Sequence, residues 1–149
     1  MKKFEFKLEK LLSYKGQMLD SELMKLAVIR KILAEQEANL QCLFAEEDVC
    51  QRNFEEKLRG NVTPAVYQIH TPYINDLKDK IKSKQREIDI INETLNDQIE
   101  KVKGFKQEEK SLKMLKESRF DEHKKQDMKK TEQLIEEFVS GAMVNSGTH

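Results

Sequence analysis

Residues whose side chains most often bind metals or act as nucleophiles are few and scattered in this sequence. The histidines are His70, His123 and His149, and the cysteines are Cys42 and Cys50. The ferritin-like di-iron site, which is also built from long helices, needs a glutamate three residues before a ligating histidine. Tyr67 and Phe120 stand at those positions. Because HExxH, CxxC and glycine-rich phosphate motifs are missing as well, the sequence predicts no catalytic residue, metal or cofactor, and therefore no enzyme.

Paired carboxylates could support acid–base chemistry, and two such pairs are Glu46–Glu47 and Glu55–Glu56. In a charged helix such pairs more often form a solvated face, so we assign them no role. Cys42 and Cys50 stand eight residues apart, about 12 Å along one helix, which is too far for a disulfide between them. Reduced thiols agree with a cytosolic protein.

The composition is typical of long helices rather than of sheets. Apolar residues make up 38% and charged residues 36% of the 149 residues, and the chain holds five glycines and two prolines. So small an apolar fraction predicts a thin seam between helices instead of a thick core. The longest aliphatic run, residues 26–29, is far too short to span a membrane, and no secretory apolar segment follows the first residues. We therefore expect a cytoplasmic protein.

Two long segments carry heptad repeats. In the first, apolar residues recur every seven positions at Leu12, Leu19, Leu26, Leu33 and Leu40, and the companion positions three residues later include Ile29, Leu43 and Cys50. In the second, the repeat runs through Ile74, Ile81, Ile88, Leu95 and Val102, with companions Leu77, Ile91, Phe105 and Leu112. Such repeats are typical of coiled-coil seams, and we expect the two segments to pair.

The helix boundaries follow from breakers and caps. Gly60–Asn61 is a typical helix stop, and Thr63–Pro64 has the residue types of a cap and a first helical position. We predict an all-α fold: a single antiparallel coiled-coil hairpin with a helix over about 4–59, a turn over about 60–64, a helix over about 64–139 and a disordered tail over 140–149. Thr71–Pro72 leaves open a kink near Pro72.

Charge is uneven although it sums to zero over the chain. Residues 101–131 hold eleven basic and six acidic residues, and residues 16–58 hold five basic and nine acidic ones. Pairing between antiparallel helices is the commonest reason for such an arrangement. Nucleic acid is not expected as a partner, because Arg119 is the only arginine in the basic stretch.

The first residues, MKKFEFKLEKLLSYKGQ, are unusually rich in aromatic and aliphatic side chains. Folding back near 60–66 would bring them beside residues 120–130, so part of this cluster can close the seam. A two-helix hairpin cannot cover all of these side chains, so we expect some of them to be exposed. An exposed aromatic and basic surface is suited to docking with a larger partner.

The opening pattern F-x-F-x-L-x-x-L-L-x-Y-K, followed by a long coiled coil and the lysine-rich segment KMLKESRFDEHKKQDMKKTEQLIEEF, resembles the FliJ family of the flagellar type III export apparatus. The resemblance runs from Lys3 to Phe138. It implies an antiparallel hairpin whose joined termini insert into the central pore of a hexameric export ATPase, as a stalk does in a rotary ATPase. It also implies contact with the cytosolic part of the export gate and handling of export chaperones, so that the protein is peripheral to the inner membrane through its partners.

On that resemblance, the candidate residues for the ATPase end are Phe4, Phe6, Leu8, Leu11, Leu12, Tyr14, Lys15, Arg119, Phe120, Lys124 and Lys125. No motif near the turn identifies residues for the gate or the chaperones. The alternative hypothesis is a generic coiled-coil tether or oligomerisation adaptor, whose seams would pair between chains instead of within one. The oligomeric state stays open, because heptads specify pairing more firmly than stoichiometry.

Overall fold

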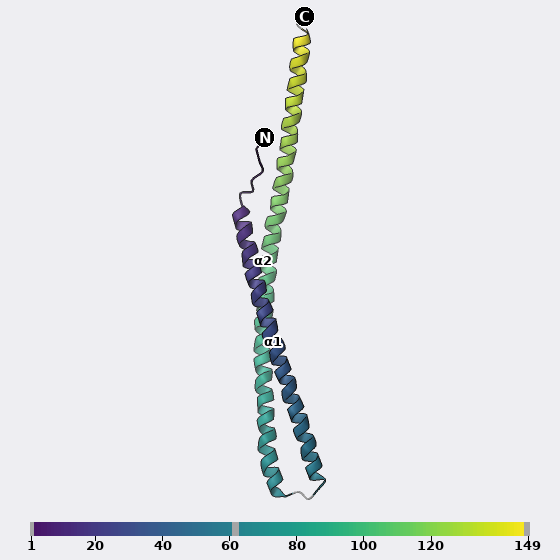
Figure 1. Cartoon of the computed structure of the whole chain (residues 1–149). Coiled ribbons are helices and arrows are strands. Elements are labelled where there is room, and N and C mark those ends of the chain that lie inside the picture. Colours follow the sequence, from purple (N-terminus) through teal and green to yellow (C-terminus); the bar gives the residue numbers. More distant parts are fainter. Residues whose placement is uncertain (1, 61–62, 148–149) are drawn as a thin grey trace. The chain divides into compact units, whose positions relative to one another are not determined.

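The computed structural model describes residues 2–60 and 63–147. Within these residues the chain forms two long helices and no strand: α1 spans Glu9–Leu58 and α2 spans Pro64–Gly147 (Figure 1). The two helices pack against each other, which confirms the predicted all-α helical hairpin.

Contacts between residues divide the chain into two compact units. The first unit comprises Met1–Leu19 and Gly104–His149, and the second comprises Asp20–Lys103. Each helix contributes to both units, so each unit contains one stretch of α1 and one stretch of α2. The second unit also contains the connection between the helices.

The buried apolar residues are those of the heptad repeats. In the first unit they are Leu12 and Leu19, and in the second they are Leu26, Ile74, Leu77, Ile81, Ile88 and Val102. Leu77 is the most deeply buried of them, with 2% of its surface exposed. The core is therefore a thin seam between the two helices, as the low apolar fraction predicted.

Three polar pairs fix the register of the second unit. Gln98 donates hydrogen bonds from Nε2 to the carboxylate and to the backbone carbonyl of Glu22. Lys84 donates to Gln36 Oε1 at 2.7 Å, and the Cys50 sulfur lies 3.7 Å from His70 Nδ1. From one pair to the next, the position moves two heptads forward along α1 and two heptads back along α2. The helices are therefore antiparallel with an unbroken register.

The same register places apolar layers between these polar pairs. Ile29 is opposite Ile91, and Leu43 is opposite Leu77, each one heptad away from a polar pair. The companion positions thus alternate between hydrocarbon and hydrogen-bonding layers through the unit. A shift of one heptad would put the Glu22 carboxylate opposite Ile91, which is unfavourable because a charged group would lose its donor.

The N-terminal segment is not helical where the sequence predicted a helix. Helix α1 begins at Glu9, and residues 2–6 have no regular structure. The backbone N–H of Glu9 donates to the Phe6 carbonyl at 3.1 Å, and that of Leu12 donates to the Leu8 carbonyl at 2.9 Å. The predicted start near Phe4 is therefore wrong by about a turn. The apolar spacing does not distinguish an aromatic residue in a helix from one in an extended segment that packs on a helix.

Around the connection, the helix ends lie where breakers and caps stand. Gly60 and Arg59 each donate a backbone hydrogen bond to a carbonyl three residues earlier, which closes the end of α1. Pro64 is the first residue of α2, and the Val66 N–H donates to the Thr63 carbonyl at 3.0 Å. Asn61, part of the predicted stop, lies outside the described residues. Helix α2 runs without interruption through Pro72.

The predicted disordered tail is wrong over 140–147, because α2 continues to Gly147. The glycine and serine content of this stretch suggested disorder, but helices tolerate isolated glycines at a cost of about 1 kcal/mol each. After Pro72, no proline interrupts α2, so no residue forces the helix to end before Gly147. Residues 148–149 lie outside the described residues.

Gly104 offers a direct test of helix propensity. It lies inside α2, and a Cβ added there would meet no atom within 4 Å. We expect Gly104→Ala to raise the free energy of unfolding by about 1 kcal/mol, because alanine restricts the unfolded chain more than glycine does. Urea unfolding followed by circular dichroism measures this change. An unchanged or lower stability would show that the backbone at 104 needs the freedom of glycine.

Candidate partner-binding surfaces

In the first unit, the N-terminal segment packs on α2 through an aromatic cluster, which we call the tip cluster (Phe4, Phe120, His123 and Lys124). The ring of Phe4 meets the rings of Phe120 and His123 edge to face, with centroids 5.3 and 5.6 Å apart. Lys124 Nζ lies 4.8 Å from the centre of the Phe120 ring. The basic segment therefore lies beside the N-terminus, as the antiparallel hairpin predicted. The role of His123 was not predicted, because its neighbour Phe4 is distant in sequence.

Ion pairs hold the start of α1 to α2 in the same unit. Lys15 Nζ lies 2.7 Å from Glu108 and 5.7 Å from the centre of the Phe105 ring. Lys116 Nζ lies 2.8 Å from Glu9. These contacts account for Lys15 structurally, although we proposed it as a partner-binding residue. Lys15 is half-buried, and ion pairs that are largely open to solvent contribute little to stability, about 0–1 kcal/mol.

The remaining candidates for the ATPase end differ in exposure. Leu12 is buried in the seam, and Phe4 and Phe6 are half-buried. The other candidate residues are exposed: Leu8, Leu11, Tyr14, Arg119, Phe120, Lys124 and Lys125. We expected that two helices cannot cover the whole N-terminal cluster, and Leu8, Leu11 and Tyr14 are indeed exposed. Their exposed fractions are 38%, 41% and 54%.

The end of α2 carries a second exposed apolar surface, which was not predicted from the sequence. In Figure 1 this part of the helix extends past the N-terminal segment. Its exposed apolar side chains include Leu134, Ile135, Phe138 and Val139, and Phe138 has 77% of its surface exposed. Spacings of three and four residues place them on one side of the helix.

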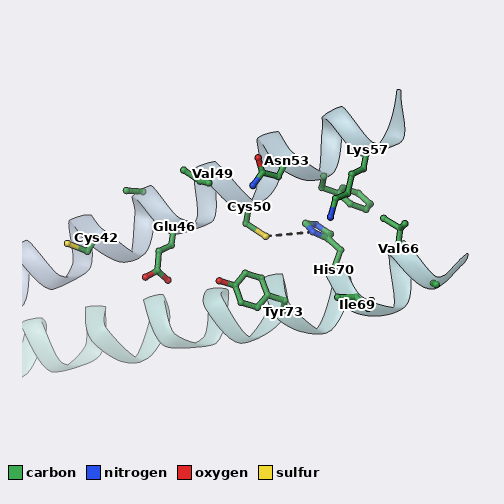
Figure 2. Close-up of a pocket in the computed structure, with 13 residues that line it drawn as sticks. Cys42, Glu46, Val49, Cys50, Asn53, Lys57, Val66, Ile69, His70 and Tyr73 are labelled. Atoms are coloured by element: carbon green, nitrogen blue, oxygen red, sulfur yellow. Dashed lines mark hydrogen bonds between the residues drawn. The ribbon is translucent and has the colours of Figure 1, made fainter. Parts of the chain in front are cut away.

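In the second unit, α1 and α2 enclose a groove of about 680 Å³ near the connection, which we call the turn-end groove (Figure 2). The residues that line it are Cys42, Ala45, Glu46, Val49, Cys50, Asn53, Phe54, Lys57, Ala65, Val66, Ile69, His70 and Tyr73. The His70 ring stacks on the Phe54 ring at a centroid distance of 3.7 Å and an interplanar angle of 5°. Ile69 and Tyr73 are exposed at 75% and 53%.

The described part of the chain offers neither a metal site nor a membrane span. No group of three or more histidine, cysteine, aspartate or glutamate side chains within residues 2–60 and 63–147 is arranged to hold a metal ion. Neither helix, over the same residues, contains an apolar stretch long enough to cross a membrane.

The sequence is similar to a known protein family. The family model described as flagellar FliJ protein matches residues 4–147, nearly the whole chain. No curated protein and no solved structure matches the sequence.

Proposed function

Because this chain belongs to the FliJ family and is thus a component of the flagellar export apparatus, we propose that it is the stalk of the export ATPase. The family is structural and non-catalytic. In this proposal the first unit inserts into the pore of the hexameric ATPase, promotes assembly and activity of the ring, and couples it to the export gate. The observation that carries the proposal is the exposed apolar and basic surface that the N-terminal segment forms with α2 around the tip cluster.

The exposed side chains support this assignment because packing within the chain does not need them. Tyr14 stands on α1 with more than half of its surface exposed, and Leu8 and Leu11 are exposed on the same short stretch. Binding energy at protein interfaces is usually concentrated in a few aromatic and arginine side chains. Tyr14 and Arg119 are residues of this kind on the surface of the first unit.

The basic residues of α2 contribute a second element. Residues 101–131 have a net charge of +5, and Arg119, Lys124 and Lys125 are exposed. Positive charge at such a surface raises the association rate with an acidic partner and fixes orientation more than it raises affinity. We expect the pore-facing surface of the ATPase ring to be acidic or polar where it meets this part of α2.

The mechanism is mechanical. The chain binds no nucleotide in this proposal, and its helices transmit force because each is supported by a seam of buried heptad residues. The cytosolic domain of the export gate and the export chaperones are further proposed partners, reached through surfaces outside the first unit. The tether or adaptor alternative is less favoured, because the seam positions pair within one chain and few are left to pair with another.

Mixing the purified chain with a flagellar export ATPase tests the proposal. We expect the parent chain to raise ATP hydrolysis and to increase the fraction of ATPase in rings, measured by enzyme assay and electron microscopy. Phe6→Ala and Tyr14→Ala together should reduce the stimulation by about tenfold or more, because losing two interface aromatic side chains costs about 2 kcal/mol or more.

The matched control is Met24→Ala, which truncates an apolar side chain of α1 that is 73% exposed and lies in the second unit. It should stimulate the ATPase as the parent does. Circular dichroism of every variant separates loss of fold from loss of contact. Absence of stimulation by the parent, or equal stimulation by the Phe6 and Tyr14 variant, would contradict the assignment.

A further inference from the structure

We propose that Cys50, with His70 as its proton acceptor, is a thiol modification site that exchanges with small uncharged aromatic disulfides bound in the turn-end groove. The proposal concerns the second unit and does not depend on the proposed function. It rests on three observations: the contact between thiol and imidazole, the fixed orientation of the ring, and the groove beside them.

The contact has the geometry that proton transfer needs. The Cys50 sulfur lies 3.7 Å from His70 Nδ1, and the two side chains point toward each other across the groove from α1 and α2 (Figure 2). In the tautomer that carries its proton on Nε2, Nδ1 accepts a hydrogen bond from the thiol. The thiolate is the nucleophilic form of cysteine, so a base at this distance favours attack.

Stacking fixes the imidazole in that position. The His70 and Phe54 rings lie nearly parallel at a centroid distance of 3.7 Å, and the Tyr67 ring meets Phe54 edge to face at 5.5 Å. Phe54 also occupies a heptad position of the first repeat, so it is held by the seam itself. A ring that cannot rotate freely keeps Nδ1 directed at the sulfur, which lowers the entropic cost of the reaction.

The groove supplies room for a ligand next to the sulfur. Its volume of about 680 Å³ lies within the range of about 300–1,000 Å³ that is common for small-molecule sites. Val49, Ile69 and Tyr73 give it apolar walls, whereas Glu46 and Lys57 of α1 are the charged groups that line it. Apolar and aromatic walls favour an uncharged aromatic ligand over a highly charged one.

The exchange balances without any further reagent. The Cys50 thiol transfers its proton to His70 Nδ1, and the thiolate attacks one sulfur of the disulfide RS–SR′. A bond forms between Cys50 Sγ and the sulfur of RS while the S–S bond of the ligand breaks. The electron pair leaves with R′S⁻, which takes the proton from His70 and departs as R′SH. The thiol is oxidised to a mixed disulfide, and the small disulfide is reduced to one thiol and the bound half.

Cys42 is an internal control on the same helix. It lines the same groove but is exposed, whereas Cys50 is half-buried. Eight residues, about 12 Å along the helix, separate the two thiols. Among the described residues that line the groove, His70 is the only histidine. Accessibility alone would make Cys42 the faster thiol, so the proposal predicts the opposite order.

The test measures release of thiopyridone from 4,4′-dithiodipyridine at neutral pH. Cys42→Ser reports Cys50 alone, and Cys50→Ser reports Cys42 alone. We expect folded Cys50 to react on the order of tenfold faster than Cys42, a modest effect for a positioned base. In urea, where the groove is lost, the two rates should become equal. Mass spectrometry should find the adduct on Cys50 in the parent chain.

His70→Gln in the Cys42→Ser background should lower the Cys50 rate to about that of Cys42. Phe54→Leu should lower it partly, because the imidazole stays but loses its stacking partner. Circular dichroism checks that both variants are folded. If either variant fails to fold, the Cys50 rates of the Cys42→Ser chain in buffer and in urea still test the proposal. A Cys50 rate no higher than that of Cys42, or no change with a folded His70→Gln variant, would overturn the proposal.

Discussion

Leu77→Ala is expected to lower the free energy of unfolding by about 2–5 kcal/mol, the range for removing most of a buried leucine side chain. Leu77 has 2% of its surface exposed and is the most deeply buried large side chain described. The loss should approach the upper part of that range, because the seam is thin and has few other side chains that can move into the space. For a chain with a stability of about 5–15 kcal/mol, one such change removes a large fraction of the total.

Ile90→Ala is the matched control, because Ile90 lies on the same helix in the same unit with 63% of its surface exposed. It removes a β-branched residue from the helix surface, so its stability should stay the same or rise slightly. Urea unfolding monitored by circular dichroism gives both values. If the two variants were equally stable, the seam would not be the source of stability in the second unit.

The two helices and their buried residues could be predicted from the sequence, because heptad spacing identifies the side of each helix that is buried against a partner helix. Leu12, Leu19 and Leu26 on α1 and Ile74, Ile81 and Ile88 on α2 were expected at the seam, and all are buried. The pairing partners across the seam could not be read in this way. Which residue of α2 faces Glu22 depends on the length of the connection and on the register, and neither is a property of one helix.

The ends of the helices were harder to predict than their middle. Near the N-terminus, Phe4 and Phe6 have the spacing of either a helix or an extended segment, and the structure shows no regular structure there. Phe4 instead packs on Phe120 and His123. At the other end, composition suggested disorder, whereas α2 continues to Gly147 because local helix formation meets no breaker. Termini are where tertiary contacts and weak propensities compete most evenly.

The candidate sites also differ in whether they depend on one segment alone or on the pairing of the two helices. Exposed apolar residues near the N-terminus were predicted by counting how many side chains two helices can cover, and Leu8, Leu11 and Tyr14 are exposed. The turn-end groove was not predicted, because it depends on the contact between Cys50 and His70 across the register. In the sequence Cys50 and His70 lie twenty residues apart, and no motif connects them. Only the antiparallel pairing brings the thiol and the imidazole together.

The polar pair of Glu22 and Gln98 has a consequence for the dependence of stability on pH. The Gln98 side-chain amide donates to the Glu22 carboxylate and lowers its pKa below the usual 4.5, and the neighbouring Lys25 ammonium lowers it further, whereas burial acts in the opposite direction. A carboxylate whose pKa is lower in the folded than in the unfolded chain stabilises the fold above the unfolded pKa. That contribution is lost as the pH falls from about 4.5 through the lower, folded pKa.

Gln98→Leu should therefore destabilise the hairpin at pH 7, because it leaves the buried Glu22 carboxylate without its amide donor. The loss should shrink as the pH falls through the acid range, since protonation removes the charge that needs the donor. Glu22→Leu combined with Gln98→Leu should recover stability at pH 7, because both polar groups are then replaced by hydrocarbon. Urea midpoints of the parent and the two variants between about pH 3 and about pH 7, a range that brackets the usual glutamate pKa of 4.5, give the three curves.

The double-leucine variant also tests whether the alternating layers select the register. With leucine at both positions, a one-heptad shift no longer places a carboxylate against Ile91, so alternative pairings become closer in energy. We expect broader unfolding transitions and a measurable fraction of other oligomers in light scattering, even though the variant is stable. The parent chain, in which the Glu22–Gln98 pair is intact, should show a sharp transition and a single oligomeric state, because only the native register gives the Glu22 carboxylate its donor. A double variant that keeps the oligomeric state of the parent and a sharp transition would mean that Gln36–Lys84 and Cys50–His70 hold the register without the Glu22 layer.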